Sequence, residues 1–255
     1  MTLNERITAF ERLSSYLQDT LNDKIGNAKL KQQIEQEQNY NAWFIPVFVK
    51  KAILAIAEMT DKKQIESWTQ PYKEMLSAQE TSLRVGVIMP GNIPLVGFHD
   101  FLSVLISGHT FIGKLSSNDA HLLPIIAEML CEIEPRFTNR ITFCSNKISP
   151  IDMIIVTGSN NAARHFSYYF QKYPSIIRKH CNSIAILDGN ESDEELRKLA
   201  DDIFLYFGLG CRSVSKVYVP DKYSFQRLFA ALDAYQDILS QHHKYLNNLE
   251  YQKTV

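Results

Sequence analysis

The sequence contains few cysteines, and their arrangement excludes two kinds of framework. The four cysteines, Cys131, Cys144, Cys181 and Cys211, form no CxxC pair and have no histidine partner at zinc spacing. A disulfide-rich scaffold or a structural zinc site needs such spacing. We therefore expect neither a disulfide framework nor a bound metal.

A surplus of charge of either sign is missing as well. The 27 Lys and Arg residues nearly balance the 28 Asp and Glu residues, the formal net charge is -1, and no run of five like charges occurs. Proteins that bind nucleic acid or an anionic membrane surface concentrate basic residues in a patch or a run. Nucleic acid is therefore not an expected partner.

Long hydrophobic runs are also absent. The longest apolar stretch, 52–57, is far shorter than the roughly 20 residues that span a bilayer. Residues 1–6 do not show the charged-then-apolar pattern of a signal peptide. We expect a cytoplasmic protein that does not associate with a membrane.

The N-terminal part of the chain predicts helices. Apolar residues recur at steps of three or four at Leu3, Ile7, Phe10, Leu13, Leu17, Leu21 and Ile25. They follow a Thr2-x-x-Glu5 capping box and precede Gly26, which together predict an amphipathic helix. After a polar stretch at 27–41, Pro46 opens a second helix that runs to about Met59, and 62–76 is expected to be a third.

From Leu83 onward, short β-branched runs alternate with helical periodicity. Strands are expected at 83–89, 110–115, 152–157, 183–187 and 213–219. Helices are expected at 95–107, at 120–133 with Asp119 or Asn118 as the cap, from Ser159 to about 171, at 192–207 and at 223–243. This alternation favours an α/β fold, with a parallel Rossmann-like sheet that carries helices on both faces.

Three loops follow predicted strands and are candidates for a ligand site: 90–94, 114–119 and 157–161. In open parallel sheets, ligands bind beyond the carboxyl ends of the strands, where helix N-termini offer free N–H groups. The chain has no GxGxxG fingerprint, and each glycine taken alone is explained by the needs of a turn. Cys211 taken alone is likewise explained as a small buried side chain.

Taken together and in order, four segments resemble the aldehyde dehydrogenase superfamily. Residues 84–95 (RVGVIMPGNIPL) resemble its strand that ends in proline, x, asparagine, x, proline, and 107–116 (SGHTFIGKLS) resemble its AAGNTVVLKPS stretch. Residues 156–159 (VTGS) resemble its FTGS, and 207–219 (FGLGCRSVSKVYV) resemble its NAGQxCxAxxRVxV around the nucleophile. The most similar branch is that of the acyl-CoA reductases related to the fatty-acid reductase of bacterial bioluminescence.

The resemblance implies a reaction and two catalytic residues. Cys211 would attack the carbonyl carbon of an acyl thioester, and the amide of Asn92 with the Cys211 backbone N–H would bind the oxyanion. Hydride from a reduced nicotinamide would then yield an aldehyde. The predicted function is therefore an NAD(P)H-dependent acyl-CoA reductase that acts on acyl-CoA or another acyl thioester.

The resemblance also implies a dinucleotide site on the three loops. Its expected residues are Met89, Pro90, Gly91, Lys114, Ser116, Ser117, Thr157, Gly158 and Ser159. Lys114 would meet the adenosine ribose hydroxyls, and Gly158 with Ser159 would approach the pyrophosphate. Ser117 stands where NAD-selective relatives carry a glutamate, so a 2′-phosphate would not be repelled and the expected cofactor is NADPH, or else NADH.

Two departures from the family pattern shape the prediction. Oxidising members carry a glutamate base in an ELGGK segment, whereas 177–183 (IRKHCNS) has no acid, which favours acyl exchange with CoA over hydrolysis. Only 44 residues (255 − 211) follow Cys211, so we expect much of the C-terminal catalytic domain to be missing. Residues 1–190 are expected to hold the N-terminal helices and the dinucleotide-binding domain, and 191–255 the start of the catalytic domain.

Other functions stay open at this point. The same residues fit a non-catalytic remnant that keeps the fold and binds a nucleotide or a partner. A cysteine hydrolase that uses Cys211 and His180 is a third reading, but no residue in the sequence is identified as its orienting carboxylate. A homo-oligomer is also left open.

Overall fold

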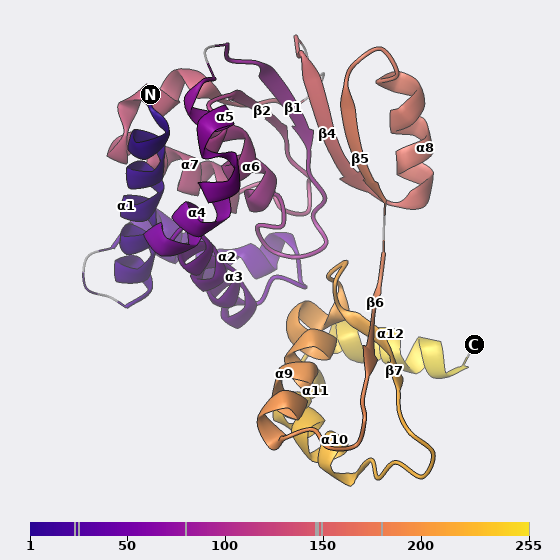
Figure 1. The fold of residues 1–255 in the computed structure, drawn as a ribbon. Helices are drawn as coiled ribbons and strands as arrows, with labels where there is room; N and C mark the ends of the chain where they lie inside the picture. Colours follow the sequence, from indigo (N-terminus) through magenta and orange to yellow (C-terminus); the bar gives the residue numbers. More distant parts are fainter. Residues whose placement is uncertain are drawn as a thin grey trace. The chain divides into compact units, whose positions relative to one another are not determined.

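The computed structural model describes residues 1–22, 24, 26–79, 81–145, 148, 150–179 and 181–254. The chain divides into two compact units, Met1–Lys179 and His180–Val255. The first unit contains the central sheet (Figure 1). Cys211 belongs to the second unit.

The first unit opens with a layer of helices and then alternates strands with helices. The helices of this unit are α1 (Leu3–Leu21), α2 (Ala28–Tyr40), α3 (Pro46–Met59), α4 (Lys62–Thr69), α5 (Lys73–Ser77), α6 (Phe98–Ile106), α7 (Leu122–Ile133) and α8 (Asn160–Tyr169), with 3-10 turns at η1 (Gln70–Tyr72) and η2 (Pro135–Arg140). The predicted helices at 46–59 and 120–133 are confirmed, the second beginning at Leu122.

The capping box of α1 is confirmed. The Thr2 hydroxyl accepts the Glu5 backbone N–H at 3.3 Å, and the Thr2 N–H donates to the Glu5 carboxylate at 2.7 Å. The helix ends at Leu21 with Asn22 as its C-cap, earlier than predicted, and Ile25 lies outside the described residues. The apolar stripe does pack inward, because Phe10 and its neighbours at helical spacing are fully buried.

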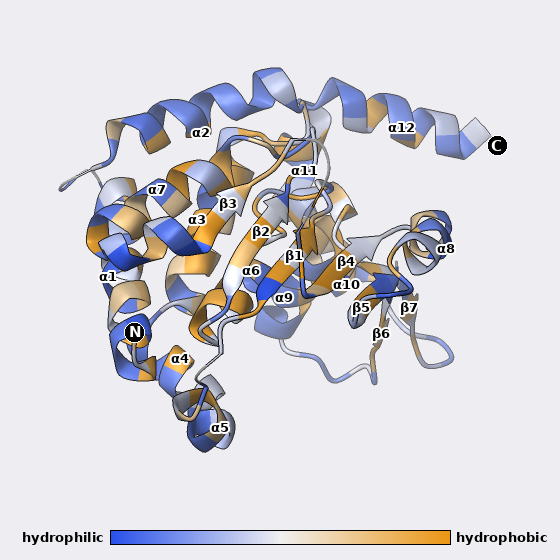
Figure 2. Cartoon of the chain, turned by 90° about the horizontal axis from the view of Figure 1, so that it is seen from above, coloured by the Kyte–Doolittle hydropathy of each residue, from blue (hydrophilic) through white to orange (hydrophobic). Residues whose placement is uncertain are grey.

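The helical layer differs from the sequence analysis at two places. The polar stretch at 27–41 forms α2, capped by the Asn27 side chain, which accepts the Leu30 N–H at 2.9 Å. The stretch 62–76 is not one helix but α4 and α5 separated by η1, which contains Pro71. Proline has no N–H for the helical ladder, which explains the break. Figure 2 shows that α2 is mostly hydrophilic whereas α3 is largely hydrophobic.

The central sheet of the first unit is parallel throughout. Its strands are β1 (Arg84–Ile88), β2 (Thr110–Lys114), β3 (Ile141–Phe143), β4 (Met153–Gly158) and β5 (Ser175–Lys179), in the order β3-β2-β1-β4-β5. The strands expected at 83–89, 110–115 and 152–157 are confirmed to within about a residue at each end. The two edge strands β3 and β5 were not predicted, since β3 is short and β5 is mostly exposed.

Helices cover both faces of this sheet, as predicted. Neighbouring residues of β2 show the two sides, because alternate side chains of a strand point to opposite faces. Phe111 packs edge-on against Phe101 of α6, with ring centroids 5.0 Å apart. Ile112 instead joins a cluster with Ile154 of β4 and Phe166 of α8. The parallel sheet is therefore buried between α6 on one side and α8 on the other.

The second unit is a small α/β arrangement. Two parallel strands, β6 (Ser183–Ile186) and β7 (Val214–Tyr218), pair with each other. The helices are α9 (Asp193–Phe204), α10 (Gln226–Leu232), α11 (Gln236–Ser240) and α12 (His243–Thr254), with 3-10 turns at η3 (Leu205–Gly208) and η4 (Asp233–Tyr235). Its core is a leucine cluster, Leu187, Leu196, Leu199 and Leu228. β6 lies before residue 190, the expected end of the first domain, but it belongs to the second unit and pairs there with β7.

Two helices predicted for the second unit are wrong in extent. The helix expected at 192–207 ends at Phe204, and the stretch at 223–243 contains α10, η4 and α11 instead of one helix. No proline or glycine marks these breaks, so the apolar periodicity predicted a single continuous helix in each case. The capping box of α9 is present, with the Ser192 hydroxyl accepting the Glu195 N–H at 3.2 Å.

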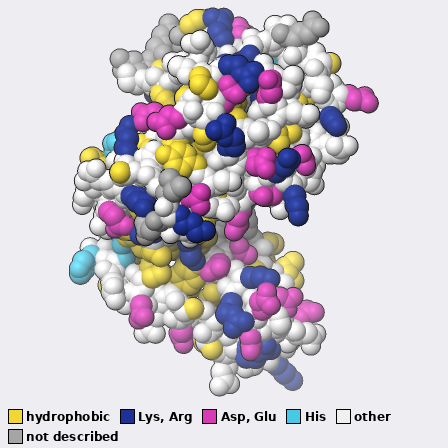
Figure 3. Space-filling view, turned by 90° about the vertical axis from the view of Figure 1, so that its left-hand side faces the viewer, with side chains coloured by type: hydrophobic (Ala, Val, Ile, Leu, Met, Phe, Trp, Pro, Cys, Tyr) yellow, Lys and Arg dark blue, Asp and Glu magenta, His cyan; other side chains and the backbone are white. Residues whose placement is uncertain are grey.

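The surface carries charges of both signs. On the face drawn in Figure 3, basic and acidic side chains are interspersed. Several of them form exposed ion pairs, such as Arg136 with Glu5 at 3.0 Å and Arg84 with Asp152 at 3.0 Å. Within the part of the chain that the structure describes, no helix is both long enough and apolar enough to cross a membrane.

Candidate functional site

The register of the parallel strands brings three loops of the first unit to one edge of the sheet. Ile88, the last residue of β1, lies level with Lys114 of β2 and with Val156 of β4. The segments that follow these residues therefore leave the sheet at the same edge. The nine expected dinucleotide residues and Asn92 all belong to the ends of these strands or to the turns after them.

The first of these turns, 89–97, carries Asn92 and is stiff. Pro90 and Pro94 bracket Asn92, and each fixes its own φ and restricts the residue before it. The Met89 N–H donates to the Lys114 carbonyl at 3.1 Å, which ties the start of the turn to β2. Met89 is only 5% exposed, so it belongs to the core.

The second turn, 115–121, packs directly against the first. A Cβ placed on Gly91 would lie 2.5 Å from Ser116 Oγ, so only glycine allows this approach. Ser116 Oγ accepts the Asn118 N–H at 3.2 Å, while Ser117 is exposed. Lys114 ends β2 and is partly exposed, so its ammonium group is available at the carboxyl edge.

The third segment, Thr157 to Ser159, joins β4 to α8. Ser159 is the N-cap of α8, and its hydroxyl accepts the Ala162 N–H at 3.2 Å. Thr157 and Gly158 are the last residues of β4 and are partly exposed. A ten-residue helix that begins at a sheet edge offers backbone N–H groups and a positive dipole end to a phosphate. With Lys114 on the same edge, these residues fit a dinucleotide.

Asp119 has a role that the sequence did not predict. Asp119 or Asn118 was expected to cap α7, but the N-cap residue of that helix is His121, which makes no side-chain cap hydrogen bond. Asp119 Oδ2 instead accepts the Leu95 backbone N–H at 2.8 Å, so the carboxylate links the two turns. Burial raises the pKa of Asp119 to about 7; the Leu95 N–H opposes this shift and the charge of Glu37 adds to it.

A second unpredicted pair lies at the end of β5. Arg178 Nη1 donates to both carboxylate oxygens of Asp100, at 2.6 and 2.8 Å. Burial raises the pKa of Asp100, but hydrogen bonds from His99 and Arg178 outweigh it and the net shift is downward. Arg178 falls in the stretch 177–183, which the resemblance aligns with the segment that carries the general-base glutamate of oxidising relatives. In this chain the stretch holds a cation in place of an acid. His180 of the same stretch lies outside the described residues.

Cys211 lies in the second unit, in a turn between η3 and β7. Three consecutive residues before it, Tyr206, Phe207 and Gly208, have φ values of 55°, 58° and 69°. Left-handed backbone is costly for the two aromatic residues, and such strain is concentrated at functional sites. The ring of Phe207 lies 4.2 Å from that of His242, so packing within the unit holds the strained segment.

The other three thiols differ from Cys211 in their surroundings. Cys181 is exposed and donates a weak S–H hydrogen bond to the Cys211 carbonyl at 3.6 Å. Cys144 donates to the Gly113 carbonyl at 3.4 Å, and burial raises the pKa of Cys131. The partly exposed Cys211 is the thiol that follows the strained turn. Because it belongs to the second unit, its pairing with Asn92 of the first unit stays a prediction.

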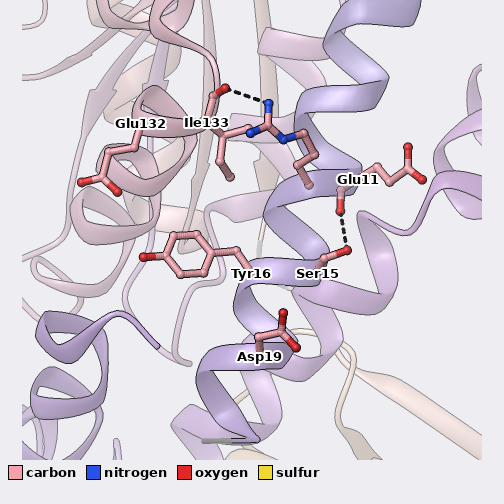
Figure 4. Close-up of a pocket in the computed structure, with 7 residues that line it drawn as sticks. Glu11, Ser15, Tyr16, Asp19, Glu132 and Ile133 are labelled. Atoms are coloured by element: carbon pink, nitrogen blue, oxygen red, sulfur yellow. Dashed lines mark hydrogen bonds between the residues drawn. The ribbon is translucent and has the colours of Figure 1, made fainter. Parts of the chain in front are cut away.

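A surface hollow of the first unit lies away from the expected residues. It is lined by Glu11, Arg12, Ser15, Tyr16, Asp19, Glu132 and Ile133, from α1 and α7 (Figure 4). Arg12 spans it by donating to the Ile133 carbonyl at 3.2 Å. Its three carboxylates would repel phosphate, so it does not suit a dinucleotide. Among the described residues, no group of three or more His, Cys, Asp or Glu is placed to hold a metal ion.

Solved structures with the same fold are aldehyde dehydrogenases. The NAD-dependent benzaldehyde dehydrogenase of Corynebacterium glutamicum is 15% identical, with a TM-score of 0.62, over 92% of this chain and 54% of that one. Aldehyde dehydrogenase 21 of Physcomitrella patens is 16% identical, with a TM-score of 0.63, over 94% and 53%. Glyceraldehyde-3-phosphate dehydrogenase GapN of Methanocaldococcus jannaschii, solved with NADP, is 13% identical, with a TM-score of 0.57, over 92% and 58%.

The chain thus spans about half the length of the solved proteins that it matches. At these identities the likeness establishes the fold, which is that of the aldehyde dehydrogenase superfamily, as predicted. No curated protein matches the chain in sequence. A sequence model of the acyl-CoA reductase (LuxC) family, however, matches residues 1–253. The chain therefore belongs to the acyl-CoA reductase (LuxC) family.

Proposed function

We propose that the protein is an NAD(P)H-dependent acyl-CoA reductase, which converts an acyl thioester to an aldehyde through an acyl-enzyme on Cys211. The observation that carries the proposal is the strand register, because it gathers Asn92, Lys114 and the start of α8 at one edge of the sheet. Membership of the acyl-CoA reductase family supports the same substrate class.

The first chemical step belongs to Cys211 and Asn92. Cys211, after losing its proton to solvent, attacks as the thiolate: its sulfur forms a bond to the thioester carbonyl carbon, and the carbonyl oxygen gains the negative charge. The Asn92 amide and the Cys211 backbone N–H donate to this oxygen, and each such donor contributes about 3 kcal/mol in typical acyl-transfer enzymes. The carbon–sulfur bond to CoA then breaks, CoA leaves as a thiolate, and the acyl group stays on Cys211.

The dinucleotide is proposed to bind at the carboxyl edge of the first unit. Lys114 would hold the adenosine ribose hydroxyls, and the N-terminus of α8 after Gly158 and Ser159 would hold the pyrophosphate. A reduced nicotinamide held by these residues would supply a hydride to the acyl carbon. The bond between that carbon and the Cys211 sulfur then breaks and releases the aldehyde.

We further propose that NADPH binds at least as well as NADH. Ser117 is exposed in the turn after Lys114 and carries no charge, so nothing at that position repels a 2′-phosphate. Of the solved proteins with the same fold, GapN was solved with NADP and the benzaldehyde dehydrogenase of C. glutamicum is NAD-dependent, so this fold accommodates both dinucleotides. In the same proposal, residues 1–190 provide the dinucleotide-binding region and 191–255 begin the catalytic domain.

A coupled assay tests the proposal. The protein is mixed with NADPH and an acyl-CoA, and the loss of reduced nicotinamide is followed together with the release of free CoA and aldehyde. We expect the three signals to appear in equal amounts and to vanish in Cys211→Ser. Dinucleotide binding without any turnover would favour the non-catalytic remnant instead.

A further inference from the structure

The side chain of Asp119 is buried beside the turn that carries Asn92. Its relative exposure is 5%, and its Oδ2 accepts the Leu95 N–H at 2.8 Å. Its Oδ1 is also buried and has no hydrogen-bond partner among the described residues. A buried carboxyl group with one unsatisfied oxygen is unfavourable. The presence of Asp119 at this position therefore calls for a functional explanation.

The residue that Asp119 holds is in a strained conformation. Leu95 has a φ of 58°, in the left-handed region that leucine rarely adopts, and it is 4% exposed. A non-glycine residue keeps such a conformation only when its surroundings enforce it. The hydrogen bond from its N–H to Asp119 is one such constraint.

A short segment that contains a proline joins Leu95 to Asn92. Ile93 and Pro94 are the only residues between them, and Pro94 is buried with a fixed φ. A shift of the Leu95 amide therefore moves the Asn92 side chain, instead of being absorbed by flexible backbone. Oxyanion donors lose much of their effect when they are displaced by about 1 Å.

The turn that carries Asp119 is held by bonds of its own. The Asp119 N–H donates to the Ser116 carbonyl at 3.1 Å, and the Asn118 N–H donates to Ser116 Oγ at 3.2 Å. Asn41 Nδ2 of the helical layer donates to the Asn118 carbonyl at 3.1 Å. Loss of the Asp119 side chain would thus leave this turn in place and release only the neighbouring one.

We propose that Asp119 is a positioning residue, which sets the Asn92 amide for oxyanion binding by anchoring the Leu95 N–H. Asp119 does not touch the substrate in this account and acts through the backbone of 92–95. The inference rests on the proposed function of Asn92. It goes beyond that function by assigning the alignment of the oxyanion donor to a carboxylate on the cofactor turn.

Three variants of Asp119 separate positioning from simple support of the fold. Asp119→Ala removes the acceptor, and Asp119→Leu removes it while filling the buried space. Asp119→Asn is the matched control, because its side-chain oxygen still accepts from Leu95. Three quantities are measured on the folded full chain: hydrogen exchange of the Leu95 amide, the rate of Cys211 acylation by an acyl-CoA, and the dissociation constant of NADPH.

In Asp119→Ala and Asp119→Leu, we expect Leu95 exchange to be faster and Cys211 acylation slower, each by roughly tenfold or more, because a buried hydrogen bond to a carboxyl group is lost. NADPH affinity should change less than the acylation rate, because Lys114 and the start of α8 do not depend on the hydrogen bond between Asp119 and Leu95. Asp119→Asn should restore both rates to near the wild-type values.

The outcomes against the proposal are distinct. Unchanged Leu95 exchange in both acceptor-free variants would show that Asp119 does not anchor the turn. Faster exchange with unchanged acylation would overturn the positioning role while leaving the proposed function intact. If wild-type Cys211 is not acylated at all, the proposed function fails first and the positioning role fails with it.

Discussion

Arg178 and Asp100 form an ion pair in which a single guanidinium nitrogen, Nη1, reaches both carboxylate oxygens, at 2.6 and 2.8 Å. The Asp100 side chain is 7% exposed and that of Arg178 44%. The pair joins the last strand of the first unit to the first turn of α6. It therefore fixes the exposed edge strand β5 to the body of the sheet layer.

Replacing Arg178 with Gln should destabilise the first unit by about 1 to 3 kcal/mol, because Asp100 would stay buried without its cation. The folded-state pKa of Asp100 is lowered below its usual 3.8, so the stabilisation is present above that pH and is lost as the pH falls through the folded-state value. Urea unfolding of both proteins at pH 7 and near pH 3 measures the effect. A penalty that stays constant at low pH would contradict this account.

The matched control for this ion pair is Arg84→Gln. Arg84 binds Asp152 at 3.0 Å with both side chains well exposed. Exposed pairs of this kind contribute little, so the free energy of unfolding should hardly change. If the two variants lose equal amounts of unfolding free energy, the burial of Asp100 does not make its ion pair more stabilising than an exposed one.

Asp119 should make stability fall as the pH rises. Its pKa is raised from 3.8 to about 7 by burial, so the folded state holds a proton that the unfolded state releases above pH 4. Relative to Asp119→Asn, the wild type should lose up to about 4 kcal/mol between about pH 4 and pH 7. Glu37 faces Asp119 from α2 and is itself bonded to His121 at 3.2 Å, so Glu37→Gln should reduce the loss. A difference between wild type and Asp119→Asn that does not vary with pH would refute the assignment.

The four thiols should react unequally with an alkylating agent at neutral pH. We expect Cys211 to be labelled roughly tenfold faster than the others, as a nucleophilic cysteine in a built site is. Cys181 is the internal control, because it is the exposed thiol of the same unit. Burial raises the pKa of Cys131, so that thiol should react slowly. Peptide-level mass spectrometry at timed intervals gives the rates, and a Cys181 faster than Cys211 would argue against the catalytic assignment.

Cofactor choice should respond to charge at residue 117. Ser117→Glu would place a carboxylate near the 2′-phosphate, so NADPH affinity should fall by roughly tenfold or more while NADH affinity changes little. Ser117→Gln has similar size without the charge and should keep the wild-type ratio. Fluorescence titration of the two dinucleotides measures the ratio, and equal losses for NADPH and NADH in Ser117→Glu would exclude this position from 2′-phosphate recognition.

Much of the sheet could be predicted from sequence because its central strands are continuous apolar runs. β1 and β4 each contain three consecutive buried residues, and β2 alternates buried with partly buried ones, which leaves a clear signal in composition. β5 is largely exposed and follows a helix of aromatic and polar residues, so it has no such signal. α2 was missed for a similar reason, since only Leu30, Ile34 and Glu37 of its residues are buried.

The candidate site divides in the same way. The turn residues around Asn92, Lys114 and Gly158 could be found because glycine, proline and lysine stand there in a recognisable order. The partners of Asp119 could not, because Leu95 is 24 positions away and its N–H carries no sequence signal. An aspartate just before a helix is usually predicted to cap it. In this structure Asp119 instead makes a hydrogen bond to the neighbouring turn.

The most direct test of the central claim is the mass of the protein after incubation with an acyl-CoA in the absence of a reductant. The account predicts an increase equal to one acyl group, located by peptide mapping on Cys211, and no such increase in Cys211→Ser. An adduct on Cys181 or another thiol, or no adduct in the wild type while dinucleotide still binds, would contradict it.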